Sequence, residues 1–118
     1  MPIFVQSSVM DLFTAAIAND SPFLVPFNAT ILKIHLNLIA APGTASTLLT
    51  VGTRADADHF VNDYDIGTGH ALGLTDITDD ATVLNTTVEA GDIIEFGHDG
   101  GGSTTGLAIV ALTLVPRN

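Results

Sequence analysis

The stretch Thr30–Ala40, TILKIHLNLIA, decides the fold because apolar and polar side chains alternate along it. Successive side chains of a β-strand point to opposite faces, so this alternation predicts a half-buried strand. The expected buried face carries four aliphatic residues, Leu32, Ile34, Leu36 and Leu38. The expected outer face carries Lys33, His35 and Asn37. The turn residues Ala41-Pro42-Gly43 then predict where the strand ends.

Further short strands are predicted on both sides of this stretch. Apolar runs and β-branched residues favour strands over residues 47–53, 59–64, 70–74, 82–88, 92–98 and 104–115. Turn chemistry separates them, as at Glu89-Ala90-Gly91-Asp92 and in the glycine-rich loop Asp99–Ser103. Many short strands at regular spacing are typical of sandwiches. We therefore expect an all-β fold, an antiparallel β-sandwich that is jelly-roll-like with about eight strands.

The N-terminal residues fit two interpretations. Val9, Leu12 and Phe13 have helical spacing, and Ser8 with Asp11 resembles a capping box. Residues 12–18 equally fit a strand before a turn at 19–22, and the β-rich remainder favours this strand. A chain of 118 residues is expected to form one domain. Residues 1–20 would be its N-terminal arm or first strand, and residues 21–118 its β-sandwich.

The last predicted strand is apolar on both faces. Leu107, Ile109 and Val115 alternate with Ala108, Val110, Leu112 and Leu114. A strand of this kind is covered on both sides, by the opposite sheet and by something outside. The N-terminal residues 2–9 are expected to reach a neighbour by strand addition. The predicted subunit or capsid interface is formed by Ile3, Phe4, Val5, Leu12, Phe13, Leu107 and Ile109.

Composition favours self-association and excludes two kinds of partner. Hydrophobic residues make up 47% of the chain, yet its net charge is −10 with only three basic residues, Lys33, Arg54 and Arg117. An apolar excess in a small chain is typical of oligomer interfaces. Binding to nucleic acid or to an anionic membrane needs clustered basic residues, so we expect neither. No secretion signal is expected at the start of the chain.

The residues that carry chemistry form no recognisable active site. Cysteine is absent, and the four histidines, His35, His59, His70 and His98, have no metal-binding spacing. Asp56-Ala57-Asp58 and Asp63-Tyr64-Asp65 are spaced to share Ca²⁺, but Leu74 stands where a calcium-binding loop needs glutamate. We expect no cofactor, with calcium as the alternative, and no enzymatic activity.

Three motifs carry a resemblance to a known class of proteins. They are the strand entry Val25-Pro26-Phe27-Asn28-Ala29-Thr30-Ile31, the Ala90-Gly91-Asp92 turn, and the alternating strand Ala108–Pro116. Together they resemble small jelly-roll virion proteins of tailed bacteriophages, especially capsid decoration (cement) proteins and head-fibre or tail-tip domains. The resemblance implies a homotrimer on the outer capsid surface that clamps the major capsid protein.

Three functions are therefore weighed. The first is a non-enzymatic structural protein of the virion that decorates and cements a capsid. The alternative is a glycan-binding or receptor-binding module of a phage tail or fibre tip, with or without calcium. A cupin-like enzyme is the third, but it needs clustered histidines with a glutamate, and Glu89 and Glu95 are the only glutamates.

Overall fold

The computed structural model describes residues 2–12, 16–43, 46–67, 69–100 and 105–117, and within them it contains strands and turns but no helix. One sheet has six strands: β1 (Ile3–Gln6), β2 (Met10–Asp11), β4 (Ala29–Ala40), β7 (Gly73–Asp76), β8 (Thr87–Val88) and β10 (Leu107–Pro116). The other has four: β3 (Ile17–Leu24), β5 (Thr47–Thr53), β6 (Val61–Ile66) and β9 (Ile93–His98). In this part of the chain, no helix is long and apolar enough to cross a membrane.

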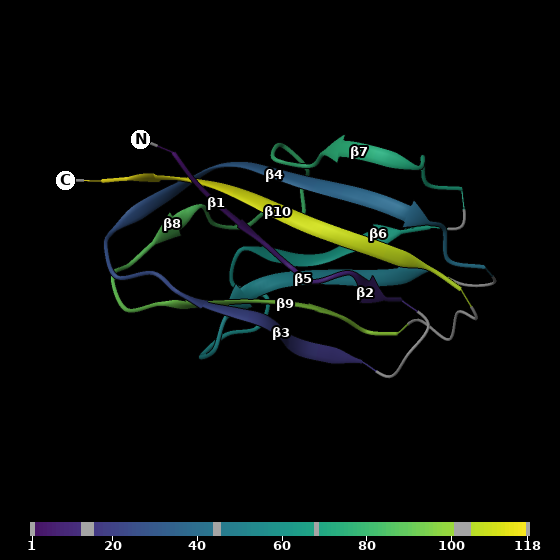
Figure 1. Ribbon diagram of the computed structural model, residues 1–118, viewed down its shortest axis with the longest axis horizontal. Coiled ribbons are helices and arrows are strands. Elements are labelled where there is room, and N and C mark those ends of the chain that lie inside the picture. Colours follow the sequence, from purple (N-terminus) through teal and green to yellow (C-terminus); the bar gives the residue numbers. More distant parts are fainter. Residues whose placement is uncertain (1, 13–15, 44–45, 68, 101–104, 118) are drawn as a thin grey trace.

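The strand order is that of a jelly roll. The six-stranded sheet follows the path β1-β10-β4-β7, and the four-stranded sheet follows β3-β9-β5-β6. β2 continues the pairing of β1 with β10, and β8 is a short addition beside β4, so each sheet has four main strands. The chain crosses several times between the two layers, with β5 and β6 forming a hairpin within one of them, and the paired strands are antiparallel (Figure 1). The predicted antiparallel β-sandwich is confirmed.

The core lies between the two sheets and is supplied by both. From the six-stranded sheet it takes the inward side chains of β10, all fully buried: Ala108, Val110, Leu112 and Leu114. From the four-stranded sheet it takes Leu49, Val51, Ile94 and Phe96, which are equally buried. The alternation predicted for β10 is therefore confirmed, because each second residue of this strand faces the core.

β4 contains two bulges, and one of them corrects the prediction. Lys33 pairs with Thr113 and Ile31 pairs with Leu114, so Leu32 is an extra residue without an opposite partner. The prediction that Leu32 faces the core was wrong: its side chain is 53% exposed, and Ile31 is buried instead. Ile39 is inserted in the same way and is 45% exposed.

The N-terminal segment differs from the predicted strand and turn. The expected turn at residues 19–22 lies inside β3, which pairs with β9 in an irregular register and has Ser21 at φ 49°. β1 pairs with β10 over Ile3–Gln6, so the first described strand belongs to the sandwich. Residues 13–15 lie outside the described ranges, and the described residues on either side of them form strands.

The strand predicted at 82–88 was mostly wrong. Only Thr87 and Val88 form a strand there, while Val83 makes an isolated bridge to Val61. Asp80 explains the difference, because its carboxylate accepts hydrogen bonds from the backbone N–H (2.9 Å) and the hydroxyl (2.8 Å) of Thr82 and so fixes a turn. The strands predicted at 59–64 and 70–74 are present but shifted toward the C-terminus.

The core predicts a large effect of truncating Phe96, whose side chain is fully buried. We expect Phe96→Ala to lower the free energy of unfolding by about 3–5 kcal/mol, because it removes apolar contacts and leaves a cavity. Leu24→Ala, at a side chain 58% exposed, is the matched control and should stay within about 0.5 kcal/mol of the parent. Urea unfolding measures both, and equal effects would contradict this description of the core.

Candidate interaction surface

The outward side of the central strand pair is not covered by any of the described residues. On β10 the outward residues, all partly exposed, are Leu107, Ile109, Ala111, Thr113 and Val115. β10 lies between β1 and β4, so its outward side chains are in the middle of the sheet face and away from its edges (Figure 1). A strand that is apolar on both sides is typical of one covered on both sides, and the described residues cover only the inner side of β10.

Neighbouring strands extend this apolar area. Phe4 on β1 lies opposite Thr113 and is 74% exposed, and Leu74 on β7 lies opposite Asn37 and is 71% exposed. The bulged residues of β4 also point outward, because an exposed side chain on a central strand has no other direction available. We call the resulting surface the apolar sheet face: Phe4, Leu32, Ile39, Leu74, Leu107, Ile109 and Val115.

The charged residues at this face are arranged as a pair. Lys33 Nζ lies 3.3 Å from Asp76 Oδ2, and His35 Nε2 lies 4.0 Å from the same oxygen. The hydroxyl and backbone N–H of Thr78 donate hydrogen bonds to Asp76, and together with Lys33 they lower the pKa of Asp76 to about 2. Asp76 is therefore ionised at neutral pH, and its charge is balanced by that of Lys33.

The seven predicted interface residues separate into three groups. Phe4, Leu107 and Ile109 belong to the apolar sheet face. Val5 and Leu12 are 4% and 0% exposed and belong to the core, so they offer no surface to a partner, and Ile3 is half-buried against that core. Phe13 lies outside the described residues.

The sequence prediction missed Leu32, Ile39 and Leu74. The first two are exposed only because of bulges, which depend on how β4 pairs with β10. Leu74 was expected in a short strand, and only its pairing with β4 places it beside the apolar residues of β10. Strand pairing is a long-range property, so no local sequence signal marks these three positions.

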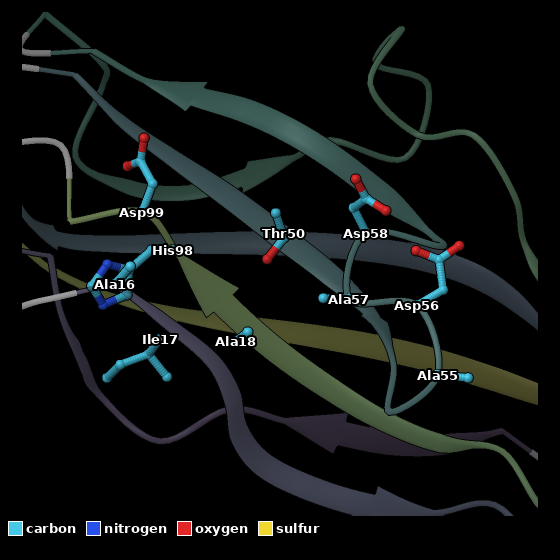
Figure 2. Close-up of a pocket in the computed structure, with 10 residues that line it drawn as sticks. All are labelled: Ala16, Ile17, Ala18, Thr50, Ala55, Asp56, Ala57, Asp58, His98 and Asp99. Atoms are coloured by element: carbon cyan, nitrogen blue, oxygen red, sulfur yellow. The ribbon is translucent and has the colours of Figure 1, made fainter.

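A groove of about 530 Å³ lies on the four-stranded sheet. It runs between the start of β3 and the loop after β5, and Figure 2 shows the residues that line it: Ala16, Ile17, Ala18, Thr50, Ala55, Asp56, Ala57, Asp58, His98 and Asp99. Gly52 allows the loop to lie on the sheet, because an added Cβ would be 2.2 Å from the carbonyl oxygen of Asp56.

The rim of the groove is acidic. A hydrogen bond between the side chains of Asp56 and Asp58 lowers the pKa of Asp56 and raises the pKa of Asp58. His59 Nδ1 lies 3.7 Å from Asp56 Oδ2. Small apolar side chains on the floor and carboxylates on the rim suit a ligand with hydroxyl or cationic groups over an apolar body.

His98 lies at the end of β9, beside the groove, and is 2% exposed. Its Nδ1 accepts a hydrogen bond from the backbone N–H of Gly100 at 3.0 Å, which places the ring proton on Nε2. This Nε2 has no hydrogen-bond partner among the described residues. Burial holds the pKa of His98 below its usual value, although the carboxylates of Asp99, Asp20 and Asp11 act in the opposite direction.

The histidines and aspartates weighed as metal ligands are not brought together among the described residues. In the part of the chain that the structure describes, no three histidine or acidic side chains are arranged to hold a metal ion. His59 contacts Asn85 Nδ2 at 3.1 Å, and His70 contacts the Tyr64 hydroxyl at 2.7 Å. These histidines therefore serve local contacts and do not form a joint site.

Two solved structures with a similar fold come from bacteriophage capsids. A chain in the acidic stable capsid structure of Helicobacter pylori bacteriophage KHP30 matches with a TM-score of 0.66 at 12% identity, over 98% of this chain and 89% of that chain. A chain in the cyanophage Pam1 capsid asymmetric unit matches with a TM-score of 0.57 at 17% identity, over 98% and 85%. The chain has the fold of phage capsid components.

The predicted likeness to jelly-roll proteins of phage virions is thus confirmed in the fold. No family model and no curated protein sequence matches the chain. At 12% and 17% identity the likeness shows a shared arrangement of strands, and a shared fold does not by itself determine function.

The buried histidine predicts that acid destabilises the fold. Unfolded His98 takes up a proton near pH 6.5, whereas its lowered pKa in the folded protein delays protonation to lower pH, so the free energy of unfolding should fall as the pH drops below about 6.5. The limiting slope for one proton is about 1.4 kcal/mol per pH unit. Urea unfolding from pH 7.5 to pH 5 measures it.

His98→Asn should lose part of this acid sensitivity, because the replacement does not titrate. Identical pH profiles for His98→Asn and the parent would contradict the assignment of His98 as a histidine held neutral by burial.

Proposed function

We propose that this protein is a structural component of a bacteriophage virion that decorates and cements the capsid. The observation that carries the proposal is an uncovered apolar sheet face on a jelly roll whose fold recurs in two phage capsid structures. A small acidic protein with such a face is suited to assembly, because contiguous apolar surface is rarely left exposed on monomers.

The charge supports a position on the outer capsid surface. The chain has 13 acidic and three basic residues, so packaged nucleic acid would repel it from the inside of a shell. Outside the shell the same charge keeps the particle soluble and prevents unspecific association between particles.

The proposed partners are further copies of the chain, in a homotrimer, and the major capsid protein. Trimerisation follows from the resemblance to decoration proteins. A cementing protein must bind more than one subunit of the shell. We therefore expect one surface to contact other copies of the chain and another surface to contact the major capsid protein. The molecule offers two candidates on opposite layers, the apolar sheet face and the groove side of the four-stranded sheet.

We propose further that the protein acts without catalysis. Three side chains capable of acid–base chemistry serve local contacts: His70 binds Tyr64, His59 binds Asn85, and Glu95, which is 4% exposed, pairs with Arg54 at 3.2 Å. A general acid or base needs access to a substrate, and these contacts restrict that access for these three groups.

Virions provide the direct test of this function. Mass spectrometry of purified particles from a phage that encodes this chain should find it at a fixed copy ratio to the major capsid protein. Purified protein added to shells that lack it should raise their melting temperature. Serum albumin at the same concentration is the control for unspecific stabilisation of the shells. Absence of the chain from intact virions would overturn the proposal.

The groove favours a second candidate function, recognition of a glycan or receptor at a tail or fibre tip. Carboxylates on its rim and Thr50 on its floor can accept hydrogen bonds from sugar hydroxyls. A glycan array tests this function, with and without calcium. Ala57→Trp, which fills the groove, should abolish any glycan signal, and a signal that survives would place recognition elsewhere.

A further inference from the structure

We propose that the apolar sheet face is the contact between copies of this chain, with a second copy as its occupant. This inference deepens the proposed function, because it assigns one of the two candidate surfaces to self-association. It rests on three features of the described residues: the size of the face, its charge, and its relief.

The face supplies more than half of the area of a standard contact. β10 has ten residues and lies between β4, with 12, and β1, with four, and the four residues of β7 lie beyond β4. At about 3.3 Å per residue and about 4.8 Å between strands, these four strands cover roughly 480 Å². A standard interface buries about 800 Å² per partner, so the face covers more than half of what one stable contact requires.

Charge decides where two copies can meet. Each copy has a net charge of −10, and its three basic side chains all pair within the chain: Lys33 with Asp76, Arg54 with Glu95 and Arg117 with Glu89. Two copies therefore repel each other over most of their surface. At the apolar sheet face the charged pair is balanced, and Asp11 lies at the margin of the face, so contact there avoids juxtaposed like charges.

The relief of the face suits a copy of itself. Phe4 protrudes from β1 at one margin and Leu74 from β7 at the other. Between them the outward positions include the small residues Ala111 and Thr113 of β10. Phe4, Leu74 and the bulged residues Leu32 and Ile39 protrude beside these small residues, so a second copy can interdigitate with the face. The exposed Lys33 and Asp76 can also exchange partners across the contact.

Sedimentation equilibrium or light scattering on the purified chain tests the assignment. At about 50 µM the parent protein should have a mass that is a multiple of 12.2 kDa, and the mass should persist in 0.5 M NaCl, which screens repulsion between copies. Leu74→Glu and Phe4→Glu should each weaken self-association at least about a hundredfold, because each places an unpaired charge in the contact.

Two variants at other exposed leucines are the controls. Leu84→Glu and Leu24→Glu lie off the face, at side chains 63% and 58% exposed, and should keep the mass of the parent. All four positions are at the surface, so circular dichroism and the melting temperature should show that every variant folds. A monomeric parent, or an oligomer that survives both Leu74→Glu and Phe4→Glu, overturns the assignment.

Shell binding separates this inference from the proposed function. If the face contacts the shell, the parent is a monomer and Leu74→Glu loses binding to shells, which overturns the assignment but supports the capsid role. If the parent assembles through the face but is absent from virions, the assignment is supported and the capsid role fails.

Discussion

The antiparallel pairing of β10 with β4 is the constraint on which the rest of the structure depends. It runs from Leu107 opposite Ala40 to Pro116 opposite Ala29 and forms the centre of the six-stranded sheet. The inward side chains of both strands form one wall of the core. Since pleating fixes which residues point outward, the same pairing also creates the apolar sheet face. Core and candidate contact are thus two sides of a single ladder.

Charge and apolar surface are kept apart in this molecule. Most acidic side chains lie in the loops and on the four-stranded sheet, whereas the outward side of β10 carries none. The separation explains how a chain with a mean hydropathy of +0.46 also carries a net charge of −10. Burial of the apolar side chains between protein layers lowers the free energy of the folded protein. Hydration of the carboxylates on the remaining surface keeps the protein in solution.

Much of the fold could be predicted from local sequence, but the surface could be predicted only in part. Thr47–Thr53 was expected with its observed bounds, and the alternation in β10 placed Leu107 and Ile109 outward. Leu32 was misplaced, because a bulge depends on the partner strand and leaves the local pattern unchanged. Val5 and Leu12 are buried by strands and turns distant in sequence, and the groove joins residues near 17, 56 and 98 for the same reason.

The position of the outermost strand also determines how the domain responds to force. Ile3 pairs with Leu114, so the beginning of β1 and the end of β10 lie together at one end of the sandwich (Figure 1). The hydrogen bonds between antiparallel strands lie perpendicular to the strands. A force that pulls these two ends apart therefore acts along the hydrogen bonds and breaks them one pair of residues at a time. β1 would therefore peel away before the core opens, and a protein layer packed over Phe4 would oppose that peeling.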